Sequence, residues 1–381
     1  MPQRGPAGQR RPAQSSREGY RAGIRQPEQN QKRFSLNKKT IALIAAALIL
    51  LILLIIIIPK LKSSSSAAPA PADTTQVSTE QVTETEPEPE PEPVPAYSYA
   101  VRDGNTIALG DEISCKYAIL IDVDENRVVA EKEGDTRIFP ASMTKVMTAL
   151  TAIEKCADLN DTFTMTSEIV APLFEANATS AGFAPGEVIT VKDLIYGAIL
   201  PSGADGTGGL AEYTAGSEAA FAEMMNEKAA SLGLNGSHFT NASGLHSDDH
   251  YSTCHDIAII MEAAMDVPEL AAALGSAEYV TTKTDAHPDG IELHHTLLYE
   301  RLEGSEEFDE KIEVIGGKTG FTDEAGNCLV TMAKVVSSGR RYIFVCAGGD
   351  GKWAPVFDTI HMYRKYLGET YDGEFVPKSQ R

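Results

Sequence analysis

The sequence predicts an α/β fold: an antiparallel sheet built from both ends of a folded region and covered by helices, with an inserted all-α subdomain, preceded by one transmembrane helix. Two observations predict it. Strand-like runs lie near both ends of residues 97–381, whereas the runs between them have helical periodicity. An apolar stretch, residues 41–58, lies well before the folded region and has the length of a membrane-spanning helix.

Residues 1–40 form a basic segment without the composition of a core. They contain ten Lys or Arg against two acidic residues, Glu18 and Glu28, with many Gln, Pro and Gly and few aliphatic residues. Such a segment cannot bury enough apolar surface to offset the entropy of folding. It is therefore predicted to be a disordered tail.

Residues 41–58, IALIAAALILLILLIIII, are eighteen consecutive apolar residues with lysines on both sides. Their length predicts a transmembrane helix. The positive charge excess lies before the helix, so we expect the N-terminus in the cytoplasm and residues after Pro59 outside the cell membrane. A cleaved signal peptide is the alternative, since residues 66–72 offer small side chains for cleavage. The long basic segment and the long apolar run favour a retained anchor.

Residues 59–96 are rich in Ser, Thr and Ala and then alternate Glu with Pro. Alternating Glu and Pro forms neither helix nor sheet, so this segment is predicted to be an extended spacer of at most roughly 120 Å. Subtracting the tail's net charge of +8 from the chain's −21 leaves −29 for residues 41–381. An acidic module of this kind is not expected to bind nucleic acid.

The five cysteines are widely separated and odd in number, which fits neither a disulfide framework nor a metal-binding pair. They are predicted to be small buried side chains, although a location outside the membrane would permit a disulfide. The cysteines are Cys115, Cys156, Cys254, Cys328 and Cys346.

The folded region, residues 97–381, begins and ends with strand-like runs. Residues 117–132 are rich in β-branched side chains on both sides of Asp124, Glu125 and Asn126, which predicts a strand, a turn and a strand. Residues 311–321, 328–336 and 341–349 predict three more strands separated by turn residues.

Helical runs lie between these two groups of strands and at the end of the region. Residues 143–153 place apolar side chains on one stripe, residues 191–200 precede a Gly-rich bend, and residues 217–234 end at a Gly-containing stop. Residues 356–367 predict a final helix. This order favours one sheet joined from both ends of the region, with a helical insertion.

A serine and a lysine, Ser142 and Lys145, lie one helical turn apart in PASMTKVMTAL. A serine hydroxyl is a weak nucleophile at neutral pH and needs a base within hydrogen-bond reach. Positions i and i+3 share a helix face, and burial against an apolar stripe lowers the pKa of a lysine, so Lys145 is a candidate base. Pro140 and Ala141 predict a helix start at Ser142, where backbone N–H groups favour an oxyanion.

Two companion motifs strengthen this interpretation. The S-x-x-K pair alone is weak, because it recurs by chance at residues 35–38 of the tail. GAILPSGADG places Ser202 in a turn after an apolar helix, and VIGGKTGFT places residues 318–320 on a strand flanked by glycine. A nucleophile at a helix start, a second serine in a loop and Lys-Thr-Gly on a strand occur together in β-lactamases and penicillin-binding proteins.

With these motifs, residues from about 115 to 370 resemble the low-molecular-mass penicillin-binding D-alanyl-D-alanine carboxypeptidases of peptidase family S11, which have a β-lactamase-like fold. The connecting segments FAPGEVITVKDLIYGAILPSGAD and FAEMMNEKAASLGLNGSHFTNASGLHSDDHYSTCHDIA carry the resemblance further. It implies that Ser142 attacks the penultimate D-Ala carbonyl of a peptidoglycan stem peptide and forms an acyl-enzyme. Lys145 would take its proton, and Ser202 would relay a proton to the leaving D-Ala.

The resemblance also implies which residues bind the substrate: Lys318, Thr319, Gly320 and Phe321. Lys318 and Thr319 would hold the terminal carboxylate, and the backbone N–H groups of Ser142 and Phe321 would form the oxyanion hole. β-Lactams would acylate the same serine. No cofactor and no metal are implied, and residues 97–381 would form a catalytic domain held at the membrane for peptidoglycan synthesis and cell shape.

One position departs from the family pattern. Where Ser-Gly-Asn is usual, this chain has Ser202, Gly203 and Ala204, so the amide expected to bond the substrate and the active-site lysine is absent. Asp205 follows, yet it is not assumed to substitute. The missing hydrogen bond would cost roughly 1.5–3 kcal/mol, so a weakly active enzyme or a non-catalytic wall-peptide-binding protein is the alternative.

A β-lactamase shares the three motifs. Class A enzymes need a Glu on a loop to drive deacylation. Glu269 superficially resembles it, but a helix start explains Pro268 and Glu269 as well, and the membrane anchor suits a wall enzyme better.

A metal-dependent peptidase is a further alternative. His246 and His250, with Asp248, Asp249 and His255 nearby, would bind zinc if the segment were helical. Its turn-forming composition and the lack of an H-E-x-x-H glutamate favour a solvated loop.

Overall fold

The computed structural model describes residues 97–302 and 311–367. The predicted tail, transmembrane helix and spacer, residues 1–96, lie outside this part of the chain. Within the described residues, no helix has both the length and the apolar character needed to span a bilayer.

The described chain alternates short strands and helices between two groups of sheet strands. The strands are β1 (Ile107–Ala108), β2 (Tyr117–Asp122), β3 (Arg127–Lys132), β4 (Thr162–Thr164), β5 (Val188–Thr190), β6 (Glu278–Val280), β7 (Glu292–His294), β8 (Ile312–Thr322), β9 (Gly326–Val335) and β10 (Arg341–Gly349). The helices are η2 (Ala141–Met143), α2 (Thr144–Ile153), α3 (Ser167–Glu175), α4 (Val191–Ile199), α5 (Ala204–Ala215), α6 (Glu218–Ser231), α7 (Cys254–Met265), α8 (Pro268–Gly275), η3 (Leu298–Leu302) and α9 (Ala354–Leu367).

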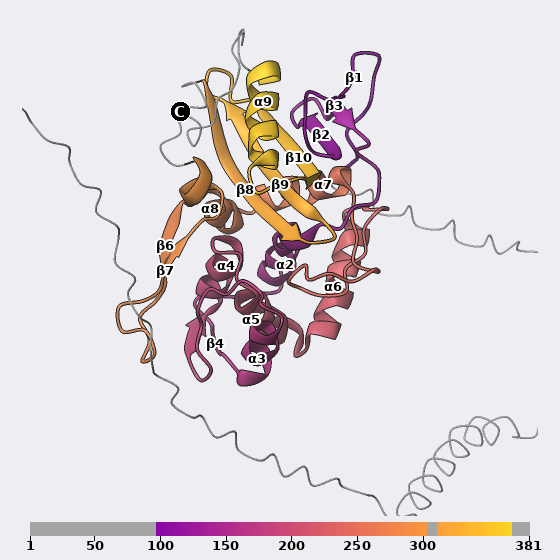
Figure 1. The fold of residues 1–381 in the computed structure, drawn as a ribbon. Coiled ribbons are helices and arrows are strands. Elements are labelled where there is room, and N and C mark those ends of the chain that lie inside the picture. The colour runs from indigo at the N-terminus through magenta and orange to yellow at the C-terminus, as the bar shows by residue number, and fades with distance from the viewer. Residues whose placement is uncertain (1–96, 303–310, 368–381) are drawn as a thin grey trace, which may run out of the picture. The chain divides into compact units, whose positions relative to one another are not determined.

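The main sheet joins the first and last strands of this region in the order β1-β3-β2-β10-β9-β8 (Figure 1). All neighbours in it are antiparallel except β1 and β3, which are parallel. The central pair is β2 with β10, where Leu120 lies opposite Phe344. The expected α/β fold, with a sheet and covering helices, is therefore confirmed.

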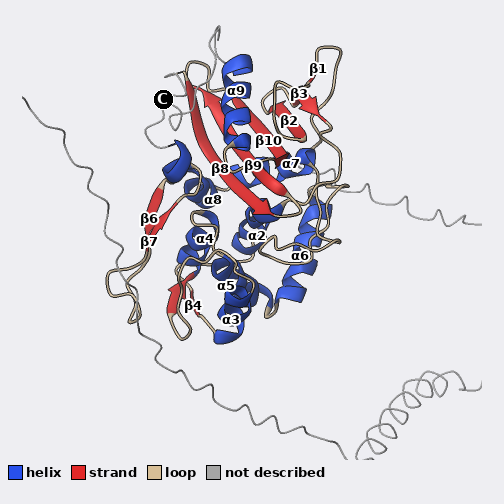
Figure 2. Ribbon diagram, in the orientation of Figure 1, coloured by secondary structure: helices blue, strands red, loops and turns tan. Residues whose placement is uncertain are grey.

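Helix α9 lies across one face of the main sheet (Figure 2). Alternating side chains of the sheet enter two separate cores. On β2, Ile119 and Ile121 face the core that contains α2, α4 and α7, whereas Leu120 faces the core closed by α9. Because β2 is buried on both faces, its residues form a short continuous apolar run bounded by turn residues, and this run made the strand predictable.

The Gly-rich segment after α4 differs from the sequence prediction, because it forms helix α5 and not a bend. A Cβ at Gly206 would lie 2.7 Å from the backbone nitrogen of Ala198 and 2.8 Å from the carbonyl oxygen of Leu194. The glycine therefore allows α5 to pack closely on α4. Helices α3, α5 and α7 were not predicted.

The five cysteines are all free thiols. Cys115, Cys254, Cys328 and Cys346 are buried, as expected for small apolar side chains, and Cys156 is half-buried.

Candidate active site

Ser142 lies in the short η2 turn that leads directly into α2. The preceding residue, Ala141, has a left-handed backbone with φ 47°, and Gly244 packs against its carbonyl. A left-handed conformation is costly for alanine and persists only where the surroundings hold it. The turn that presents Ser142 is therefore fixed from outside the helix.

Lys145 lies one turn after Ser142 and points its amine at the serine. Lys145 Nζ is 2.8 Å from Ser142 Oγ and donates to the carbonyl oxygen of Ser243 at 2.7 Å. The side chain is only 2% exposed. Burial lowers the pKa of Lys145 to about 7, although the nearby carboxylate of Asp205 raises it. A large part of the Lys145 population is then neutral and able to accept a proton near pH 7.

Ser202 stands in the turn between α4 and α5, where the structure brings it to Lys318. Its backbone is left-handed with φ 63°, and its side chain is buried. Lys318 Nζ donates to Ser202 Oγ at 2.8 Å and to the carbonyl oxygen of Thr319 at 3.0 Å. Burial and the neighbouring cations of Lys145 and Arg301 hold the pKa of Lys318 well below its usual range.

The end of β8 lies against the turn of Ser142. A Cβ at Gly320 would lie 3.1 Å from the backbone nitrogen of Ser142 and 3.0 Å from the carbonyl oxygen of Pro140, so a glycine permits this close approach. Thr319 Oγ1 lies 2.8 Å from Thr296 Oγ1, which fixes its side chain. Phe321 follows on β8 with its side chain exposed.

These groups line one cleft of about 520 Å3. All seven residues of the predicted site except Lys318 line it directly, and Lys318 lies behind it against Ser202. The cleft contains Ser142, Lys145, Ala176, Asn177, Ala178, Thr179, Pro201, Ser202, Ala204, Ser243, Gly244, Leu245, Thr296, Glu300, Arg301, Thr319, Gly320, Phe321, Thr322 and Lys352.

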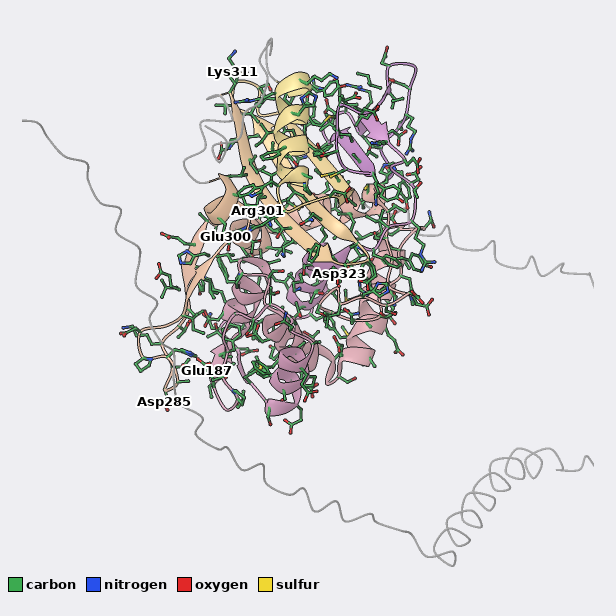
Figure 3. The ribbon with its side chains drawn as sticks, in the orientation of Figure 1. Glu187, Asp285, Glu300, Arg301, Lys311 and Asp323 are labelled. Atoms are coloured by element: carbon green, nitrogen blue, oxygen red, sulfur yellow. The ribbon has the colours of Figure 1, made fainter. Side chains whose placement is uncertain are left out.

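Arg301 of η3 is a cleft residue that sequence reasoning missed (Figure 3). Its Nε is buried and has no hydrogen-bond partner among the described residues. Burial lowers its pKa, but a guanidinium remains charged in proteins. Lys352 also lines the cleft, and its amine is 3.6 Å from Glu300. The cleft therefore contains positive charge in addition to that of Lys318, and no sequence motif indicated it.

Ala204 lines the cleft at the position where the family carries an amide. Asp205 does not replace that amide, because its carboxylate turns away and accepts hydrogen bonds from residues 180–183. The hydrogen bond expected from an asparagine is therefore not supplied by the next side chain.

The histidines of the metal hypothesis serve separate contacts. His250 is buried, with Nε2 2.8 Å from Thr144 Oγ1, and burial lowers its pKa to about 4. His246 approaches Asp248 at 3.5 Å, and His255 pairs with Asp135 at 3.0 Å. His246 and His250 lie in the segment before α7, which is a loop over most of its length, whereas His255 lies in the first turn of α7.

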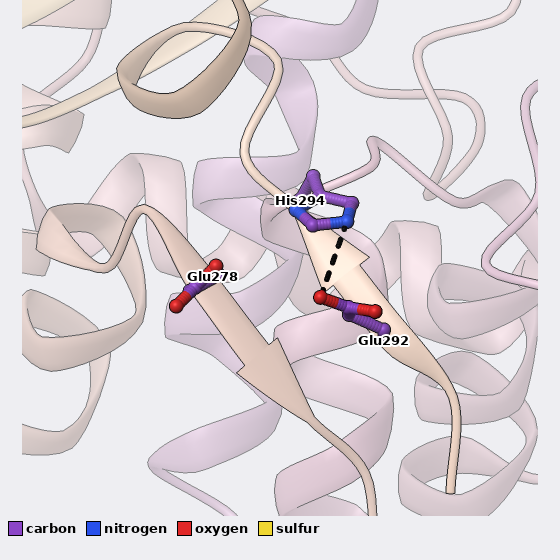
Figure 4. Close-up of side chains that lie close together, drawn as sticks. All are labelled: Glu278, Glu292 and His294. Carbon is purple, nitrogen blue, oxygen red and sulfur yellow. Dashed lines mark ion pairs between the residues drawn. The ribbon is translucent and has the colours of Figure 1, made fainter. Parts of the chain in front are cut away.

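A different group of possible metal ligands lies on the β6–β7 hairpin (Figure 4). Ligand atoms of Glu278, Glu292 and His294 are within 4.8 Å of one another, and His294 Nε2 is 3.7 Å from Glu292 Oε1. Both glutamates are exposed, as is common for acidic groups without a metal. None of the three lines the cleft.

Glu269, considered for a β-lactamase, lies in the first turn of α8 after Pro268. It lines a separate hollow with Lys192 and Tyr196 and is not among the residues that line the cleft. Its position therefore gives no support to a deacylating glutamate.

Comparison with known proteins identifies the family. A family model described as D-alanyl-D-alanine carboxypeptidase matches residues 104–351. The chain belongs to this carboxypeptidase family. The carboxypeptidase DacF of Bacillus subtilis is 33% identical over 242 residues, which cover 62% of this chain and 58% of DacF. For DacA of Escherichia coli the identity is 32% over 247 residues, covering 62% of this chain and 57% of DacA. The chain thus spans little more than half the length of these carboxypeptidases.

Solved carboxypeptidase-family structures agree with the fold. The Streptomyces K15 DD-transpeptidase is 25% identical, with a TM-score of 0.58, covering 66% of this chain and 97% of that protein. A D-alanyl-D-alanine carboxypeptidase from Mycobacterium tuberculosis is 27% identical, with a TM-score of 0.57, covering 68% of this chain and 94% of that protein.

Proposed function

We propose that this protein is a serine-type D-alanyl-D-alanine carboxypeptidase that removes the terminal D-Ala from peptidoglycan stem peptides. The observation that supports it most is the 2.8 Å contact between the buried amine of Lys145 and Ser142 Oγ. A hydroxyl with a base at this distance, in a cleft beside a Lys-Thr-Gly strand, suits acyl transfer.

In the first half of the reaction, neutral Lys145 takes the proton of Ser142 Oγ while the oxygen attacks the penultimate D-Ala carbonyl. The backbone N–H groups of Ser142 and Phe321 stabilise the developing oxyanion, as the approach of Gly320 to the Ser142 turn allows. The peptide bond breaks as the proton taken by Lys145 passes through Ser202 to the amine of D-Ala, which leaves Lys145 neutral again. The products are an acyl-enzyme and free D-Ala.

In the second half, water attacks the acyl-enzyme ester while neutral Lys145 takes a proton from it. Lys145 returns this proton to Ser142 Oγ, which leaves as the hydroxyl, and the shortened peptide is released. A β-lactam forms the same ester with Ser142 but releases no separate amine, so its acyl-enzyme persists.

The terminal carboxylate of the substrate needs a cation in the cleft. Lys318 is fully buried, and its donors are directed at Ser202 and Thr319, so it acts chiefly through these groups. The exposed side of the site carries Arg301, whose charge is permanent. We assign the carboxylate to Thr319 Oγ1 with Arg301, and Lys318 to the proton path through Ser202.

The location is part of the same proposal. A retained helix at residues 41–58, followed by the spacer at residues 59–96, would hold the catalytic domain at residues 97–381 outside the membrane, within reach of the cell wall.

The direct test is release of D-Ala from a peptide ending in D-Ala-D-Ala. Purified protein should release D-Ala, and Ser142→Ala should not. Binding of the peptide by both proteins without release by either would support the alternative, a non-catalytic wall-peptide-binding protein.

The pH dependence follows from Lys145. Protonated Lys145 cannot accept the Ser142 proton, so kcat/KM is expected to rise with pH through about 7 and to level off above it. Initial rates of D-Ala release between pH 5 and pH 9 measure this. A profile that falls across this range would contradict the assignment of Lys145 as the base.

Restoring the family amide is expected to increase activity. In Ala204→Asn, an amide in the cleft would bond substrate and raise kcat/KM by about 10-fold. The thermal midpoint should be measured alongside, because Ala204 is buried and the larger side chain must fit. An unchanged kcat/KM in a stable variant would mean that the missing amide does not limit this enzyme.

A further inference from the structure

The carboxylate of Asp205 is buried directly behind the active-site turn. The residue lies in the first turn of α5 and is 1% exposed. Among the described residues no Lys, Arg or His nitrogen lies within 4.0 Å of it, so hydrogen bonds carry its charge. Oδ1 accepts hydrogen bonds from the backbone N–H groups of Ala181 at 2.8 Å and Gly206 at 3.0 Å. Oδ2 accepts one from Ser180 Oγ at 2.6 Å. It also accepts from the backbone N–H groups of Gly182 at 2.9 Å and Phe183 at 3.1 Å.

A second set of bonds joins the same two segments at the cleft. Thr179 Oγ1 donates to the carbonyl oxygen of Ser202 at 2.5 Å, and the backbone N–H of Ala204 donates to the carbonyl oxygen of Thr179 at 2.8 Å. Residues 176–179 form part of the cleft wall, and Ser202 forms another part. The cleft wall of residues 176–179 and the turn of Ser202 are therefore joined by hydrogen bonds into one unit, and Asp205 is the charged residue at its centre.

This unit holds a strained residue. Ser202 is not glycine, yet its φ is 63°, a conformation that persists only where the surroundings enforce it. The strained turn aims Ser202 Oγ at Lys318. If the hydrogen bonds of Asp205 to residues 180–183 were lost, the turn would relax and the Ser202 hydroxyl would move away from the reacting groups.

Resting on the function proposed above, we propose that Asp205 is a positioning residue, whose carboxylate holds the Ser202 turn and the cleft wall of residues 176–179 in the geometry that receives the substrate. Ordinarily such a carboxylate would be a helix-capping group. Here the N–H groups that it accepts from belong mainly to another segment, so it fastens that segment to α5.

The same charge also acts on the base. Asp205 raises the pKa of Lys145 against the effect of burial. The other ionisable groups coupled to Lys145 are Lys318 on β8 and His250 before α7, and the charge of Lys145 lowers the pKa of both. Removing the charge of Asp205 should therefore lower the pKa of Lys145.

The test uses Asp205→Asn in the full-length protein. An amide keeps the shape but turns an NH2 group toward the N–H groups of Gly182 and Phe183, which cannot accept from it. Acylation by a fluorescent penicillin is expected to slow by about 100-fold, the cost of a small misplacement of reacting groups. The acid limb of the pH profile is expected to move to lower pH, which a purely structural defect would not cause.

Two variants serve as controls. Ser180→Ala removes the bond that Ser180 Oγ donates to Asp205 and the one that it accepts from the N–H of Gly182, but it leaves the backbone bonds of Asp205. Acylation should therefore stay within about 3-fold of the unmodified rate. Asp358→Asn alters another buried carboxylate, which belongs to α9 and does not line the cleft. It accepts hydrogen bonds from Ser114 and Cys115. The variant should lower the thermal midpoint without moving the acid limb.

Acylation of Asp205→Asn within about 3-fold of the unmodified protein, or an acid limb that stays in place, would overturn the inference. So would an equal loss of activity in Asp358→Asn at equal stability. If the unmodified protein itself does not react with penicillin, the proposed function fails instead, so the two failures are distinguishable.

Discussion

Replacing Lys145 by methionine is expected to slow acylation of Ser142 by about 10³-fold or more, because methionine cannot take the proton of the attacking hydroxyl. Methionine is similar in length and apolar, so it fits the buried site that Lys145 occupies. The acylation rate is measured at pH 8 from reactions with a fluorescent penicillin that are quenched at successive times. Lys192→Met is the matched control, because this exposed lysine of α4 lies outside the cleft.

Loss of the fold would not explain this result. The pKa of Lys145 is about 7 in the folded protein and about 10.4 in an unfolded chain. Between these values the unfolded state binds a proton that the folded state releases, so burial of Lys145 costs folding free energy near neutral pH. The variant is therefore expected to unfold at a higher temperature than the unmodified protein. Acylation within about 10-fold of the unmodified rate would contradict the role of Lys145.

Gly244→Ala is expected to destabilise the fold by about 3 kcal/mol or more and to slow acylation by about 100-fold. Gly244 has φ 81°, and a Cβ there would lie 1.9 Å from the carbonyl oxygen of Ala141. That carbonyl belongs to the residue just before Ser142, so the turn that presents the nucleophile must move. Chemical unfolding and penicillin acylation measure the two effects.

Gly216→Ala is the control that separates the strain of a left-handed backbone from the steric clash with Ala141. Gly216 has φ 73°, and a Cβ there would contact no atom within 4 Å. This control should lose only about 1 kcal/mol and keep its acylation rate. Equal losses in both variants would show that the contact with Ala141 is unimportant.

The sequence predicted the sheet better than the helices, for a physical reason. Strands β2 and β10 are buried on both faces, so each is a short run of apolar and β-branched residues bounded by turn residues, which is easily recognised in a sequence. Helix α7 is buried on nearly all sides, so its sequence has no polar face to reveal a period. Helix α5 is rich in glycine because its backbone packs on α4, and glycine in a sequence indicates a turn more often than a helix.

The site could be predicted where its residues lie in local motifs. Ser142 and Lys145 share one turn, and 318–320 are consecutive, so sequence spacing carried this information. Arg301 could not be predicted, because only the path of the chain after β7 brings η3 to the cleft. The hydrogen bonds of Asp205 likewise depend on a loop 22–25 residues earlier, and residue spacing does not encode such a contact.

The most direct measurement is mass spectrometry of the protein after brief reaction with benzylpenicillin, followed by mapping of the acylated peptide. The expected result is one penicilloyl group on Ser142, formed faster at pH 8 than at pH 6 and absent from Ser142→Ala. An adduct on another residue, or none on the folded protein, would contradict a Ser142 nucleophile activated by Lys145.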